Sequence, residues 1–218
     1  MSLERLIYSV PAILIAIVLH ELSHAYVSYR LGDPTPKQTG RLSLNPIRHL
    51  DPLGSLMLLF VGFGWAKPVQ INPNYYKNRK AGTVLVSLAG PFANFILALI
   101  GSLLISLVRR LVGDSITFET KAGYQAFVYL LQFLYYFMML NIGLGVFNLI
   151  PFPPLDGSKV LASVLPEPAY SYWMRYERYG QFILMVILYV GLLNKPLSIL
   201  RNGVYVGMQT ITNALVGL

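Results

Sequence analysis

Long apolar runs alternate with short polar stretches along most of the chain. Two of these runs, residues 84–108 and 126–150, are long enough to cross a bilayer as helices, which takes roughly 20 residues. A third run, residues 6–31, ends before Gly32, Asp33 and Pro34, which are residue types that stop helices. Two weaker runs follow at 179–193 and 197–218. The pattern predicts an all-α polytopic membrane protein with about five or six transmembrane segments.

The stretch from residue 35 to residue 80 breaks this pattern, because it is rich in proline, glycine and asparagine. Within it, "LGSLMLLFVGFGW" has an apolar core that is too short to span a bilayer as a helix. The next stretch, "AKPVQINPNYY", has the residue types of an extended strand, and its prolines would confine it to a sheet edge. We therefore expect a short re-entrant or β-strand region between the first two spans.

Composition agrees with a membrane protein. The chain is 55% hydrophobic and only 12% charged, with a mean hydropathy of +0.56, values outside the usual range of soluble proteins. We expect one transmembrane domain over residues 1–218, with a core at 6–165 and accessory C-terminal spans at 178–218.

The net charge of +8 comes from basic residues in loops beside apolar segments. Basic residues in such loops set the orientation of membrane helices and attract anionic lipid headgroups. We therefore expect a lipid bilayer as partner and no nucleic acid. The connection after the first run holds eight Lys and Arg residues, whereas the next connection holds three. This asymmetry predicts that the first connection is cytoplasmic. We expect a multi-pass protein of a prokaryotic cell membrane.

The unusual polar group of the first apolar run is "HELSH", residues 20–24. His20 and His24 are four residues apart, so a helix places both imidazoles on one face, where they can bind one metal ion. Glu21 lies beside that face, in reach of a water at the metal. This is the spacing of a zinc hydrolase, and the absence of cysteine excludes thiolate ligands.

A catalytic zinc site normally has three protein ligands, so one ligand must come from elsewhere in the chain. Asp156 is the first candidate, because it follows "PFPP" at the end of an apolar run and precedes Gly157, which permits close backbone approach. A charge at membrane depth costs roughly 2.5–3.5 kcal/mol unless it is paired or bound to metal. His49, in the polar sequence "NPIRHLDP", is the second candidate.

Four sequence blocks, "HELSH", "GWAKPV", "SLAGPFAN" and "FNLIPFPPLDG", together resemble the site-2 protease family of intramembrane zinc metalloproteases. The resemblance covers residues 19–160. It implies one zinc ion per chain with His20, His24 and Asp156 as ligands, and Glu21 as the catalytic residue. Substrates of that family are transmembrane-helix proteins, which are cut within or near the membrane.

The same resemblance implicates Asn148 in binding substrate or steadying the oxyanion, and Asn94 in substrate binding. Both asparagines could equally bridge helices by hydrogen bonds. The extended stretch Trp65, Ala66, Lys67, Pro68 and Val69 is expected to pair with an unwound substrate as an added edge strand. An ordinary interfacial loop anchored by Trp65 is the alternative.

Two other functions are open to such a sequence. A zinc transporter would need polar residues along a whole pathway, and the later apolar runs carry few carboxylates and no histidine. A catalytically silent zinc-binding scaffold would need the metal ligands but would have no use for Glu21. The sequence identifies neither the substrate nor the oligomeric state.

Overall fold

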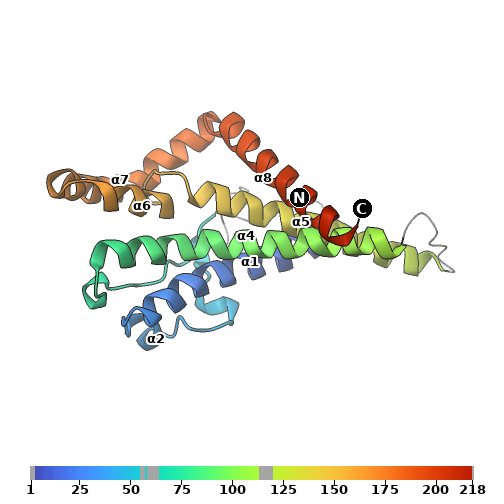
Figure 1. The fold of residues 1–218 in the computed structure, drawn as a ribbon, viewed down its shortest axis with the longest axis horizontal. Helices are drawn as coiled ribbons and strands as arrows, with labels where there is room; N and C mark the ends of the chain where they lie inside the picture. Colours follow the sequence, from blue (N-terminus) through green and yellow to red (C-terminus); the bar gives the residue numbers. More distant parts are fainter. Residues whose placement is uncertain (1–2, 55–56, 58–63, 113–119, 218) are drawn as a thin grey trace.

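Three long helices lie side by side and form the body of the protein in this computed structural model, which describes residues 3–54, 57, 64–112 and 120–217 (Figure 1). They are α1 (Leu3–Arg30), α4 (Arg79–Val112) and α5 (Lys121–Asn148). Among the described residues these are also the three single helices long and apolar enough to cross a membrane. The predicted all-α membrane protein is therefore confirmed for this part of the chain.

The predicted number of five or six spans is wrong for the described residues, which offer three spans, or four if one bent pair counts as a single span. The pair is the end of α7 (Glu167–Val190) with α8 (Asn194–Val216), which meet at 87°. Gly191 causes the break, because it adopts a left-handed φ of 77° that ends α7. The apolar part of α7, Tyr179–Val190, measures about 18 Å at 1.5 Å per residue and is too short to span.

The predicted strand is also wrong. Residues 66–72, the predicted extended segment, form no regular strand, and their pairing in the described structure is one isolated antiparallel bridge between Leu50 and Ala66. The proline at position 68 can donate no backbone hydrogen bond, which limits pairing on this segment. The predicted re-entrant piece falls largely on residues 55–56 and 58–63, outside the described residues.

Four short helices lie between the long ones in the described part of the chain. They are α2 (Thr35–Gln38), η1 (Pro46–Arg48), η2 (Pro73–Tyr75) and α6 (Asp156–Val164). Gly157 lets the start of α6 lie against the end of α5, since a Cβ there would collide with the Leu149 carbonyl oxygen and lie 2.7 Å from that of Ile150. Asp156 is thereby carried back toward the long helices.

The core lies between α4 and α5 and contains Ala98, Ile105, Leu134, Met138, Ile142 and Val146. Helix α8 attaches to α4 through polar contacts: Ser102 Oγ lies 2.8 Å from Thr212 Oγ1, and Ser106 donates to Asn213 Oδ1 at 2.8 Å. Polar contacts of this kind hold membrane helices together.

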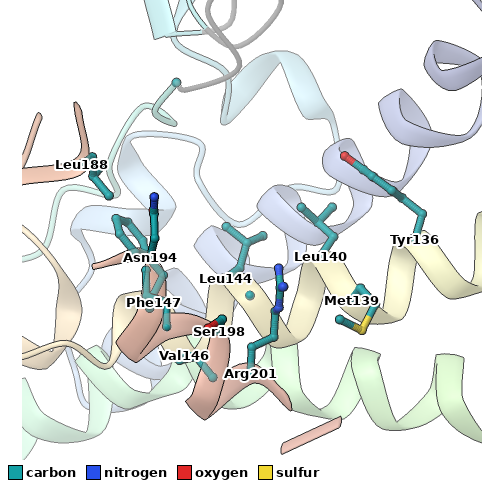
Figure 2. Close-up of a pocket in the computed structure, with 13 residues that line it drawn as sticks. Tyr136, Met139, Leu140, Leu144, Val146, Phe147, Leu188, Asn194, Ser198 and Arg201 are labelled. Atoms are coloured by element: carbon teal, nitrogen blue, oxygen red, sulfur yellow. The ribbon is translucent and has the colours of Figure 1, made fainter. Parts of the chain in front are cut away.

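The bend between α7 and α8 leaves a cavity of about 710 Å³ against α5 (Figure 2). Its lining is mostly apolar, with Leu140, Leu144 and Phe147 from α5. Arg201 of α8 lies on the same lining and is the one charged side chain among the described residues that form it.

Candidate metal centre

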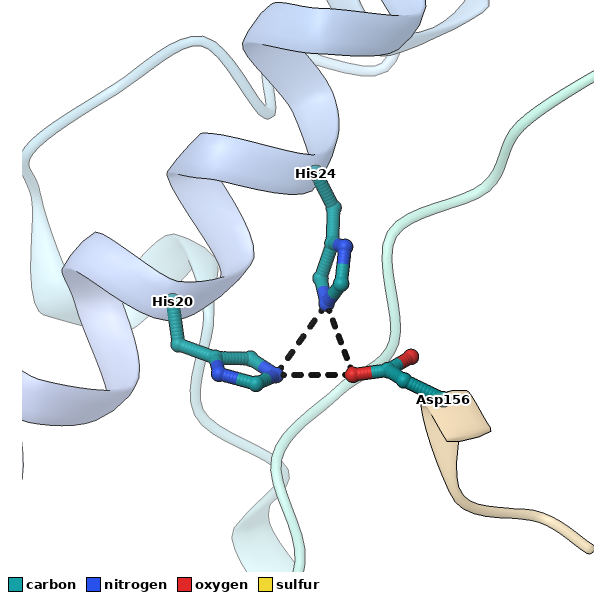
Figure 3. A group of neighbouring side chains, drawn as sticks. All are labelled: His20, His24 and Asp156. Carbon is teal, nitrogen blue, oxygen red and sulfur yellow. Dashed lines mark hydrogen bonds and ion pairs between the residues drawn. The ribbon is translucent and has the colours of Figure 1, made fainter. Parts of the chain in front are cut away.

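Two turns of α1 and the first residue of α6 form the candidate metal site. His20 and His24 of α1 point toward Asp156, as Figure 3 shows. The Asp156 Oδ2 atom lies 3.3 Å from His20 Nε2 and 3.1 Å from His24 Nε2, and the two Nε2 atoms are 3.1 Å apart. Each of the three residues is only 8% exposed.

The outer nitrogens of both histidines are held by oxygen atoms. His20 Nδ1 lies 2.6 Å from Asn94 Oδ1, and His24 Nδ1 lies 2.6 Å from the Val86 carbonyl oxygen. Since a carbonyl or amide oxygen can only accept, both Nδ1 atoms must carry the proton and donate it. The lone pairs of both Nε2 atoms then face the centre of the triangle, as metal ligation requires.

This donor set fits a zinc ion. Three lone-pair atoms face one another within 3.3 Å, and buried Asp156 Oδ2 has no hydrogen-bond donor among the described residues. Without a cation such an arrangement is repulsive. Ligand atoms about 2.0 Å from a tetrahedral centre lie about 3.3 Å apart, close to the observed separations.

Helix α4 closes the back of the site at "AGPFAN". A Cβ on Gly90 would collide with His24 Nε2 and lie 2.6 Å from His20 Cε1. Glycine at this position therefore allows α4 to approach the imidazoles. One turn on, Asn94 is fully buried and bonds His20, and its amide nitrogen donates to Asn141 Oδ1 at 2.8 Å.

A small cavity of about 140 Å³ opens beside the triangle and brings together most of the residues expected from the sequence. Its lining includes His20, Glu21, His24, Pro68, Val69, Asn148, Asp156 and Lys159. Glu21 Oε2 accepts a hydrogen bond from the Val69 backbone N–H at 3.1 Å. Asn148 donates to the Leu144 carbonyl at 3.0 Å, which leaves its second N–H for another acceptor.

Some expected residues lie elsewhere. Asn94 is not in the lining of this cavity, and its Oδ1 accepts a hydrogen bond from His20 Nδ1 instead. Trp65, Ala66 and Lys67 are also off the cavity lining, and the Lys67 N–H donates to the His49 carbonyl at 2.9 Å. His49 itself is fully buried, with Nε2 2.7 Å from the Ser43 carbonyl, outside the metal triangle.

Asp33 fixes the far end of the extended segment. Its carboxylate accepts hydrogen bonds from the Asn72 N–H at 2.7 Å, the Thr35 N–H at 2.9 Å and the Ser28 hydroxyl at 2.8 Å. Burial alone would raise the pKa of Asp33, but these donors outweigh it and hold the pKa below its usual value. Burial raises the pKa of Tyr76, whose hydroxyl lies 2.8 Å from that of Ser28.

Sequence reasoning missed Gly90, Asn141, Lys159 and the buried Arg41. The signals were weak but present: a glycine before a proline inside an apolar run, a second asparagine within a span, and a basic residue three positions after Asp156. Arg41 carries no such signal in the sequence. Gly90 meets the imidazoles of α1, Asn141 meets Asn94 of α4, and Arg41 meets Pro68, and residue type alone does not identify these distant partners.

Comparison with known proteins decides the family. The family model of peptidase family M50 matches residues 8–192. The chain belongs to peptidase family M50. This confirms the predicted resemblance to the site-2 protease family.

Curated relatives of this M50 protein agree. A Bacillus subtilis protein named "Putative zinc metalloprotease YwhC" is 40% identical over 84% of this chain and 80% of its own length. "Putative zinc metalloprotease Rip2" of Mycolicibacterium smegmatis is 29% identical over 84% of this chain and 66% of its own length. "Zinc metalloprotease MJ0392" of Methanocaldococcus jannaschii is 25% identical, and the match covers 45% of its length. No solved structure gives a significant match.

The M50 protein is thus a zinc metalloprotease with membrane-spanning helices, and its metal is zinc. The predicted enzyme class and cofactor are confirmed at this level.

Proposed function

We propose that this M50 protease hydrolyses peptide bonds in or near the transmembrane helices of membrane-protein substrates, in regulated intramembrane proteolysis. The observation that carries the proposal is the position of the metal triangle: two of its corners are on α1, a candidate membrane span, beside a polar cavity. His20, His24 and Asp156 hold the zinc, which supplies Lewis-acid activation of water and of the scissile carbonyl.

Glu21 acts as the general base in this proposal. Its carboxylate lines the same cavity as the metal triangle, takes a proton from the attacking water and later gives it to the leaving amine. The free N–H of Asn148 is a second donor to the oxyanion that develops on the substrate. Asn94 orients the His20 ring, because its Oδ1 accepts a hydrogen bond from the His20 Nδ1–H.

An unwound substrate needs new partners for its backbone. We assign that role to residues 65–69, of which Pro68 and Val69 line the cavity. Three backbone groups there are already bonded, namely the Lys67 N–H, the Pro68 carbonyl and the Val69 N–H. Substrate pairing is therefore left to the remaining backbone groups of the extended segment.

We further propose that the protein lies in a prokaryotic cell membrane with the zinc toward the cytoplasm, as the basic loops indicate. Residues 6–165 form the catalytic core in this proposal, and residues 178–218 are accessory.

The direct test is to map the cut. Purified protein is reconstituted in vesicles with a set of single-span membrane proteins, and the products are measured by mass spectrometry. We expect new termini within or immediately beside the apolar segment, and no products after zinc is removed with a chelator. Cuts confined to soluble loops would contradict the intramembrane assignment.

The cavity between α5 and the bent α7–α8 pair is our candidate for receiving the substrate helix, because consecutive residues of α5 line the two cavities: Phe147 lines the first and Asn148 the zinc cavity. Gly143 also lines this cavity, and a Cβ on it would meet no atom within 4 Å. We therefore expect Gly143→Phe to fold but to slow cleavage of membrane substrates by about tenfold, the effect of about 1.4 kcal/mol of lost binding.

Gly203→Phe is the matched control, since a Cβ there also meets no atom within 4 Å but Gly203 is off the cavity lining. Both variants are compared with wild type by cleavage rate, zinc content and thermal unfolding. Equal rates for Gly143→Phe and Gly203→Phe would contradict the assignment.

A further inference from the structure

A buried arginine lies close to the proposed general base. Arg41 follows α2 and is only 4% exposed. Its guanidinium donates to two backbone carbonyls, those of Arg48 and of Pro68, the second at 2.8 Å. Within the described part of the chain it forms no ion pair at 4.0 Å or less. A buried cation is costly, so its position requires compensation from the groups around it.

The Pro68 carbonyl and the Val69 N–H belong to the same peptide unit. The carbonyl oxygen accepts from Arg41, and the N–H donates to Glu21 Oε2 at 3.1 Å. A peptide unit is planar, so fixing its oxygen also fixes the direction of its N–H. The bond at this position is trans, which places Arg41 and Glu21 at opposite ends of the peptide dipole.

Two hydrogen bonds at opposite ends of one peptide unit polarise each other. The positive guanidinium draws electron density toward the Pro68 oxygen, which makes the Val69 N–H a better donor to the Glu21 carboxylate. The same guanidinium also joins two loops, because the Arg48 carbonyl belongs to the segment before the extended one. Arg41 therefore fixes the peptide in place and strengthens its bond to Glu21.

We infer that Arg41 is a positioning residue for Glu21 and acts through the Pro68–Val69 peptide. This inference rests on the proposed role of Glu21 as general base. A glutamate side chain has several rotatable bonds, and a base must be aimed at the proton that it removes. The Val69 N–H holds one carboxylate oxygen and leaves the other for the water.

The test compares Arg41→Gln and Arg41→Lys with wild type in the vesicle assay. We expect Arg41→Gln to lower kcat by about 10- to 100-fold, the usual effect of losing a group that orients a catalytic residue. KM and zinc content should stay near wild type, because Arg41 is not part of the metal triangle and its own side chain does not line the cavity. Arg41→Lys should recover part of kcat, since one ammonium can still reach one carbonyl.

Arg48→Gln is the matched control. Arg48 is a basic residue of the same loop with an exposed side chain, and the bond to Arg41 uses only its backbone carbonyl. Its replacement should leave kcat unchanged. An equal loss in Arg48→Gln would mean that the charge of the loop matters rather than the contact, and would overturn the inference.

Val69→Pro removes the hydrogen bond at the other end of the same peptide unit, because proline has no N–H to give to Glu21. We expect a loss of kcat similar to that of Arg41→Gln. The double variant should lose no more than Val69→Pro alone, since both changes act through one contact. Multiplied losses in the double variant would show that Arg41 acts independently of this peptide and would overturn the inference, as would zinc loss in Arg41→Gln.

The two proposals fail in different ways. If Glu21→Gln cleaves as fast as wild type, the general-base assignment is wrong, and this inference falls with it. If Glu21→Gln is inactive but Arg41→Gln keeps the wild-type kcat, only the inference is wrong.

Discussion

Replacing Glu21 by glutamine is expected to lower cleavage by about 100- to 10,000-fold, the range for loss of a general acid–base group. Glutamine has nearly the same shape, and its amide oxygen can still accept the Val69 N–H that Glu21 accepts at 3.1 Å. It cannot take up a proton at neutral pH. The loss should therefore appear in kcat, with KM little changed.

Zinc content and thermal unfolding are the controls for this variant. Glu21 is not in the metal triangle of His20, His24 and Asp156, so the glutamine variant should bind zinc as wild type does. Glu21→Asp keeps a carboxylate on a shorter side chain and should retain part of the activity. Normal cleavage by Glu21→Gln would leave the protein without its proposed base and would favour a different proton acceptor.

Removing Asp156 is expected to empty the metal site. Wild-type protein should carry about one zinc per chain, measured by elemental mass spectrometry, and Asp156→Ala and His24→Ala should carry almost none. Each replacement leaves two ligands, which is too few for a stable catalytic site. Loss of a residue that only hydrogen-bonds a metal ligand lowers metal affinity by up to roughly 100-fold. We expect loss of a ligand itself to lower zinc affinity by more than that.

His49→Gln is the matched control for the ligand variants, because His49 is the remaining histidine of the chain and binds the Ser43 carbonyl instead of the triangle. The glutamine amide can still donate to that carbonyl. This variant should keep its zinc. Zinc retained in Asp156→Ala but lost in His49→Gln would transfer the third ligand to His49 and show that the triangle is wrong.

Local geometry explains what could be predicted at the site. The positions of His20, Glu21 and His24 on one helix follow from their spacing, because a helix repeats every 3.6 residues. Asp156 could be ranked first only because prolines and Gly157 mark the end of an apolar run, and the resemblance to known proteases favoured it further. The groups behind these residues were not predictable in the same way. His20 meets Asn94 74 positions later, and His24 meets the Val86 carbonyl 62 positions later.

By itself the sequence determined the three long spans, the pair of histidines with its glutamate, and the family. These features depend on residue type and on spacing within one helix, which the backbone geometry converts directly into a shared face. Only the tertiary structure decided that α7 and α8 meet at a sharp bend, that the extended segment forms one bridge instead of a strand, and that Arg41 reaches Glu21 through a peptide. Such features depend on which distant segments pack together, because a buried polar group bonds to whatever partner the fold brings within about 3 Å.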